Sequence, residues 1–103
     1  MKPLFSLLTL FIGLIGSQFT YADETHICLY GGNERIIKVT YTNPGSKVPC
    51  QVVYEKNTGS QVLWNAENEE GYCEAKAGEF VEKQRGWGWD CALMEATAAQ
   101  TAQ

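Results

Sequence analysis

Hydrophobic and polar residues alternate along the chain between His26 and Ala66, and this period of two predicts β-strands. The runs are rich in β-branched and aromatic residues, and glycine, asparagine or proline separates each run from the next. The expected strands are His26–Tyr30, Arg35–Tyr41, Cys50–Lys56 and Gln61–Ala66. Because the connections are short enough to be turns, we expect these strands to pair antiparallel, as a meander.

After Asn68 the hydrophobic period lengthens to about 3.6 residues, which predicts one amphipathic helix. The positions that recur on one side of this helix are Cys73, Ala77, Phe80, Val81 and Gln84. Asn65 or Asn68 is a candidate N-cap, and Gly86 is expected to end the helix in the left-handed conformation. The segment 87–93 is expected to be either a fifth strand or an extended tail.

The register of the sheet follows from placing Tyr41 opposite Cys50 across the loop Asn43–Pro49, because directly opposed residues project from the same face. A two-residue turn at Gly32-Asn33 and a three-residue loop at Asn57–Gly59 then bring most large apolar side chains to one face. That face is expected to hold Cys28, Tyr30, Ile37, Val39, Tyr41, Cys50, Val52, Tyr54, Val62, Trp64 and Ala66. We therefore predict an α+β fold, a four-stranded or five-stranded antiparallel meander with one helix packed on this face.

All four cysteines follow residue 22, and an even number in a small exported domain predicts two disulfides that stabilise the fold. In the expected register Cys73, at the start of the helix, comes close to Cys50, whereas Cys28 lies about 13 Å further along the strands. Bonded cysteines have Cα atoms within about 7 Å of each other, so the preferred pairs are Cys50–Cys73 and Cys28–Cys91. The pairing of Cys28 with Cys73 and of Cys50 with Cys91 stays open.

The first 22 residues have the layout of a secretory signal peptide, with a basic residue, an apolar core over Leu4–Ile15 and small residues before the expected cleavage after Ala22. A membrane anchor would need about 20 apolar residues, and this core is shorter. Cleavage leaves a domain over residues 23–95 and a tail over 96–103, which has no large apolar residue and is expected to be disordered. The expected location is therefore periplasmic or secreted.

The net charge of the chain after Ala22 limits the classes of partner that we expect. Seven basic and twelve acidic residues follow Ala22, which is a net charge of −5, and Arg35, Lys38, Lys47 and Lys56 are scattered along the chain. Nucleic acid or an anionic membrane surface would need a concentrated positive field. Neither is therefore expected as a partner, and no membrane span is expected after cleavage.

Candidate catalytic residues are few. The single histidine, His26, lies in the first strand, where a surface or edge position is the favoured interpretation. Glu69, Glu70 and their acidic neighbours are interpreted as charges that favour the helix N-terminus, with a glycosidase-like acid–base pair as the less favoured alternative. With the thiols paired, no cysteine nucleophile or zinc ligand remains, so we predict no catalytic residue, no metal and no cofactor. A small hydrolase that acts through carboxylates or His26, and a metal-binding protein with four free cysteines, are the alternatives.

The strongest candidate for a partner-binding site is the segment where the helix ends, which holds Arg85, Trp87 and Trp89. Tryptophan and arginine are enriched where proteins bind partners, and Gly88 leaves the two neighbouring rings unshielded. The favoured alternative is that at least one of the two rings closes the core beneath the helix, since a small domain needs its tryptophans for packing.

Four segments, VPC-x-V-x-Y, LWNAEN, GYCEAKAGEFV and GWGWDC, together resemble a group of uncharacterised small exported bacterial proteins. The resemblance covers Arg35 to Cys91 and implies export and a shared small domain, but it transfers no functional residue. Exported lysozyme inhibitors are similar in size and location, but their loop of small residues has no counterpart here. The expected function is a non-enzymatic binding module, inhibitors included, whose partner is a protein or an envelope component.

Overall fold

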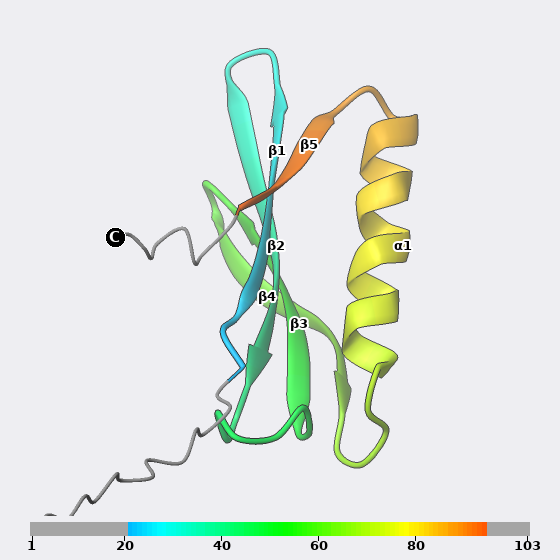
Figure 1. Cartoon of the computed structure of the whole chain (residues 1–103). Coiled ribbons are helices and arrows are strands. Elements are labelled where there is room, and N and C mark those ends of the chain that lie inside the picture. Colours follow the sequence, from blue (N-terminus) through cyan, green and yellow to red (C-terminus); the bar gives the residue numbers. More distant parts are fainter. Residues whose placement is uncertain (1–20, 95–103) are drawn as a thin grey trace, which may run out of the picture.

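Five strands and one helix make up the part of the chain that the computed structural model describes, residues 21–94 (Figure 1). The elements in chain order are β1 (Glu24–Tyr30), β2 (Asn33–Tyr41), β3 (Cys50–Lys56), β4 (Gly59–Ala66), α1 (Tyr72–Gly86) and β5 (Asp90–Met94). Neighbouring strands are antiparallel in the order β4-β3-β2-β1-β5, and α1 packs against one face of the sheet. The predicted α+β fold is confirmed, with a fifth strand after α1.

Two sequence predictions fall wholly or mostly outside this range. The signal peptide expected over residues 1–22, apart from its last two residues, and the tail expected over 96–103 lie outside the described residues. Within residues 21–94 no helix is long and apolar enough to cross a lipid bilayer.

The core lies between α1 and one face of the sheet. Tyr41 pairs with Cys50 as predicted, and Ile37, Val39 and Val52 are fully buried on the same face. The helix adds the buried residues Cys73, Ala77, Val81 and Gln84, with Phe80 half-buried beside them. This confirms the predicted helix stripe. Burial of each large aliphatic side chain contributes roughly 1.5–3 kcal/mol, so this contact is the main reason that α1 stays on the sheet.

The turn between β1 and β2 is Gly31-Gly32, one residue earlier than predicted. The first of these glycines has φ +64, which a residue without Cβ adopts at no steric cost. Cys28 consequently lies opposite Arg35 and not opposite Ile37. This shift of two residues leaves every side chain on its expected face. It also increases the separation of Cys28 from Cys50 along the strands from about 13 Å to about 20 Å.

The hairpin between β3 and β4 also departs from the prediction. Its turn has two residues, Asn57-Thr58, and not three, so β4 begins directly after it. A β-bulge that leaves Leu63 unpaired then restores the expected register, with Trp64 opposite Val52. Between the turn and the bulge the two faces are exchanged. Val62, expected in the core, therefore lies on the opposite face and is 47% exposed.

Glycine, and not asparagine, shapes both ends of α1. Gly71 is the N-cap with φ +91, and no side chain caps this end; Asn65 and Asn68, the predicted caps, lie in β4 and in the loop after it. Gly86, the predicted stop, is the last helical residue, and the left-handed residue is Gly88 with φ +103. Amides of the three residues after the helix donate to carbonyl groups of its last turn. This arrangement directs the chain back to the sheet.

The two disulfides join the cysteines that the register favoured. Cys28–Cys91 connects β1 to β5, where the two residues are direct cross-strand partners. Cys50–Cys73 connects β3 to the first turn of α1, with 6.3 Å between the Cα atoms. One bond therefore holds an edge strand and the other holds the helix to the sheet. All four cysteines are bonded, which is compatible with an oxidising location.

Candidate functional site

The structure gives Trp87 and Trp89 different surroundings. Trp87 is 61% exposed, and its ring meets the ring of Phe80 edge-on, with 6.4 Å between centroids. Trp89 is half-buried against the core, 5.4 Å from the ring of Tyr30, and the guanidinium of Arg35 lies 4.9 Å from the centroid of its indole. Trp89 therefore helps to close the core beneath the helix exit, whereas Trp87 faces solvent.

Arg85 and the glycine between the tryptophans hold this turn in place. The Nη2 group of Arg85 donates to the carbonyl oxygen of Cys91 at 2.9 Å, and its Nη1 group pairs with the carboxylate of Glu82. Arg85 thus connects α1 to β5. A Cβ atom added at Gly88 would lie 3.3 Å from the ring of Tyr30, so the chain approaches this ring as closely as glycine allows.

Trp87 is the last member of a row of aromatic side chains on the flank of α1 that faces β4. Phe80 contacts it from the helix, and Trp64 of β4 lies 6.0 Å from Phe80 between ring centroids. Tyr72 continues the row at the start of the helix, eight residues before Phe80. We call Trp64, Tyr72, Phe80 and Trp87 the aromatic stripe. Its first three members are half-buried, and Trp87 is exposed.

Two lysine side chains lie over aromatic rings, one over the stripe itself and one over a ring beside it. The ammonium group of Lys76 is 5.6 Å from the ring centroid of Trp64 and 5.7 Å from that of Tyr72. The ammonium group of Lys56 is 5.8 Å from the centroid of Tyr54, whose ring packs edge-on against the middle of the stripe. Such contacts contribute about 0.5–1 kcal/mol at exposed sites. Lys76 therefore places an ammonium group over the first two members of the stripe, and Lys56 places one over a ring that packs against Phe80.

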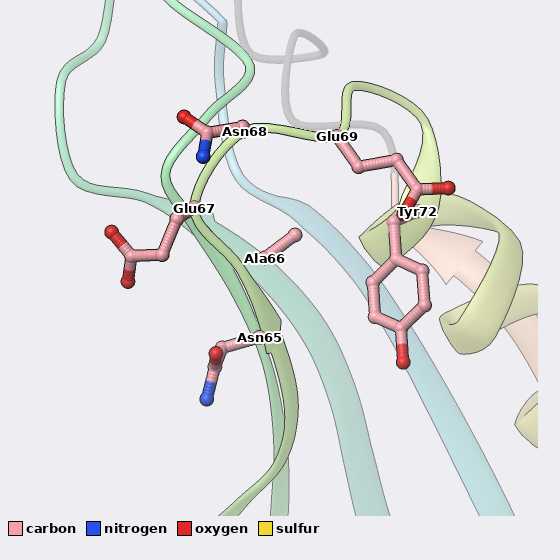
Figure 2. Close-up of a pocket in the computed structure, with 6 residues that line it drawn as sticks. All are labelled: Asn65, Ala66, Glu67, Asn68, Glu69 and Tyr72. Carbon is pink, nitrogen blue, oxygen red and sulfur yellow. The ribbon is translucent and has the colours of Figure 1, made fainter.

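A pocket of about 280 Å³ lies at the other end of the stripe, where the chain passes from β4 into α1 (Figure 2). It is lined by Asn65, Ala66, Glu67, Asn68, Glu69 and Tyr72. Figure 2 shows Tyr72 and Ala66 on the helix side of this bend and the carboxylate of Glu67 on the other side. Because Tyr72 belongs to both features, pocket and stripe are continuous. Glu67 and Glu69 make this end acidic.

The residues considered for catalysis are not brought together. His26 lies on β1, which is a central strand and not an edge; its side chain is 14% exposed, and its Nε2 is 2.9 Å from Oε2 of Glu24. Glu69 lines the pocket, and Glu70 is exposed in the loop before α1. The hydrogen bonds and ion pairs within residues 21–94 join neither glutamate to His26. In the same range no three histidine, cysteine or acidic side chains are grouped to hold a metal ion.

Two polar contacts position α1 on the sheet. The hydroxyl of Tyr41 donates to Oε2 of Glu74. Burial of Tyr41, together with this hydrogen bond and the negative charge of Glu74, raises the pKa of Tyr41 well above its ordinary value. Further along the helix, Nε2 of Gln84 donates to the hydroxyl oxygen of Tyr54 at 3.0 Å. Oε1 of Glu74 and Oε1 of Gln84 are buried with no hydrogen-bond partner among residues 21–94, so within this range both contacts leave the polar groups only partly satisfied.

The sequence signal for the stripe is the i, i+4, i+8 spacing of Tyr72, Lys76 and Phe80, which places them on one flank of a helix. That spacing does not show that the flank faces Trp64, because the position of Trp64 depends on the bulge in β4. Comparison of the chain with known protein families, with curated proteins and with solved structures gave no match. The assignment of a function therefore rests on the geometry of these residues.

Proposed function

We propose that the chain is an exported, non-catalytic binding domain that holds a protein or an envelope component against the aromatic stripe. The signal peptide expected over residues 1–22 supports export, and the two disulfides are compatible with the conditions outside the cytoplasm. In this proposal Trp87 contacts the partner directly. Arg85 and Trp89 fix the turn that presents it.

The observation that carries the proposal is the exposure of Trp87 at the end of a continuous row of aromatic side chains. Tryptophan is among the residues that supply the largest share of binding energy at protein interfaces. The core at the helix exit is already closed by Trp89, so packing does not explain Trp87. Removal of its exposed ring from water would contribute about 25 cal/mol for each Å² of apolar surface.

The test compares Trp87→Ala with the matched control Leu29→Ala. Leu29 is 51% exposed on the face of the sheet opposite to α1, so its removal takes away exposed apolar surface outside the stripe. The oxidised domain is immobilised, and saturable binding of soluble envelope proteins and of cell-wall fragments is measured over a range of concentrations. We expect Trp87→Ala to weaken binding roughly 30-fold, which corresponds to a contact worth about 2 kcal/mol.

Both variants should stay folded with only a small fall in melting temperature, because neither side chain closes the core and Trp87 loses only its edge-on contact with Phe80. Binding that is unaffected by Trp87→Ala, or that is lost with Leu29→Ala instead, would refute the proposal. Loss of binding together with loss of folding would show that Trp87 is a packing residue.

A further inference from the structure

Among the strands of residues 21–94, β4 is an edge of the sheet, because it pairs with β3 on one side and with none of these strands on the other. In an antiparallel ladder the amide and carbonyl groups of alternate residues point away from the partner strand. The outer side of β4 therefore presents a row of donors and acceptors. Apart from the ladder with β3, none of the hydrogen bonds within residues 21–94 involves a group of Gly59–Ala66.

We propose that the partner is an extended polypeptide segment, which adds to β4 as an antiparallel strand and lays alternate side chains on the aromatic stripe. This inference rests on the proposed function, since it uses the same stripe, and it specifies the class of partner. The eight residues of β4 extend about 26 Å and the fifteen residues of α1 about 22 Å. A segment of about seven residues spans this length. Main-chain bonds to the edge would supply affinity, and contacts with the stripe would supply specificity.

Charge along β4 and the stripe favours one order of side chains in the added segment. Glu67 and Glu69 lie where β4 leads into α1, whereas Lys56 lies at the hairpin end of β4. An antiparallel segment begins at the acidic end and finishes at the hairpin end. Basic residues near its start and acidic residues near its end complement both groups.

A second copy of the chain fits this edge poorly. Pairing of two β4 strands about a two-fold axis would place both α1 helices on the same face of one continuous sheet. Lys56 of each copy would then lie near Glu67 and Glu69 of the other copy, because the hairpin end of one β4 meets the far end of the other, so the shape of the strand, and not its charge, opposes this pairing. The bulge at Leu63 adds a local twist, which opposes edge-to-edge pairing of identical strands. A short flexible segment can follow that twist.

The first measurement uses a phage-displayed library of random heptapeptides, selected on the oxidised domain and resynthesised for Kd measurement by fluorescence anisotropy. We expect the enriched peptides to carry basic residues before acidic ones, and reversal of that order to weaken binding. N-methylation at every second position, where the peptide amides face β4, should weaken binding by up to about tenfold per site. N-methylation at the intervening positions should have little effect.

The second measurement uses Lys56→Glu, with Lys47→Glu as the control. Lys47 lies in the loop between β2 and β3, near Tyr21, so the control makes the same change of charge away from the stripe. Lys56→Glu should raise the Kd about tenfold, as expected for a lost charged contact, and Lys47→Glu should leave it unchanged. On addition of the peptide, the largest amide shifts in NMR spectra should fall on β4 and α1.

Three results would overturn the inference: no enriched peptide, N-methylation effects that do not alternate, or amide shifts centred on β5. If one of them occurs while Trp87→Ala still weakens binding of the envelope partner, the proposed function stands and strand addition alone is wrong. If Trp87→Ala has no effect on either ligand, the proposed function itself fails.

Discussion

Removal of each disulfide in turn gives a quantitative test of how the fold is stabilised. The two variants are Cys28→Ala with Cys91→Ala, and Cys50→Ala with Cys73→Ala. In the chain-entropy description a disulfide stabilises the fold by restricting the unfolded chain, and its effect grows with the length of the loop that it closes. The separation of 63 residues for Cys28–Cys91 corresponds to about 4 kcal/mol, and the separation of 23 for Cys50–Cys73 to about 3 kcal/mol.

Each of these values is a large share of the roughly 5–15 kcal/mol by which small domains are stable. Alanine retains the Cβ atom and removes two buried sulfur atoms in either variant, so the cavity contribution is similar in both. The structure adds a local difference. Cys91 lies in β5, a five-residue strand that within residues 21–94 is an edge of the sheet and pairs with β1, so loss of the Cys28–Cys91 bond should also loosen β5.

The free energy of unfolding is measured by urea denaturation, followed by circular dichroism, with thiol titration to verify that the other bond is intact. We expect both variants to be less stable than the wild type. The free energy of unfolding should be lower for Cys28→Ala/Cys91→Ala than for Cys50→Ala/Cys73→Ala, by about 1 kcal/mol. Hydrogen exchange should show loss of protection in β5 for this variant. A reversed order, or a loss below about 1 kcal/mol in both variants, would refute the entropic reasoning for this fold.

Two further predictions concern single residues. Gly88→Ala should destabilise the fold by about 1–3 kcal/mol, because φ +103 is unfavourable for an L side chain and the new Cβ would lie 3.3 Å from Tyr30. Gly78→Ala lies inside α1, and its new Cβ would have nothing within 4 Å. In the same urea assay this variant should be more stable than the wild type by up to about 1 kcal/mol. Stability should also fall above about pH 10, where Tyr41 loses its proton in the unfolded chain but retains it in the fold because its pKa is raised. Tyr41→Phe removes the hydrogen bond to Glu74, which should lower the free energy of unfolding by about 1 kcal/mol at neutral pH. The stability of this variant should decline less steeply than that of the wild type at alkaline pH. An equally steep decline would contradict the role given to Tyr41.

The pairing of the cysteines could be predicted because it depends on little besides the face on which each side chain lies. Once Tyr41 is opposite Cys50, the period of two assigns a face to every residue of β2 and β3, and the helix period directs Cys73 inward. The turn between β1 and β2 was misplaced by one residue, which moved the register by two. Cys28 therefore stayed on the same face and became more distant from Cys50, so the predicted pairing was confirmed despite the error.

The exposure of Val62 and the position of Trp64 beside Phe80 could not be predicted, for one shared reason. The segment Asn57–Gly59 suits a two-residue turn as well as a three-residue loop, and a difference of one residue reverses every side chain that follows. The bulge at Leu63 cancels that reversal for the rest of β4. Tertiary packing selects such a bulge, and no residue type near Leu63 marks it in the sequence.

The nested arrangement of the disulfides determines how the domain responds to proteolysis. Cys28–Cys91 closes the main chain into a covalent ring that contains β2, β3, β4 and α1, and Cys50–Cys73 closes a smaller ring inside it. A protease that cuts once in the loop Asn43–Pro49, or at any other bond between Cys28 and Cys91, releases no fragment, because the two pieces remain joined. Nicked and intact chains would differ in mass by one water molecule until a reductant separates the pieces, so single cuts in exposed loops leave every strand attached to the sheet.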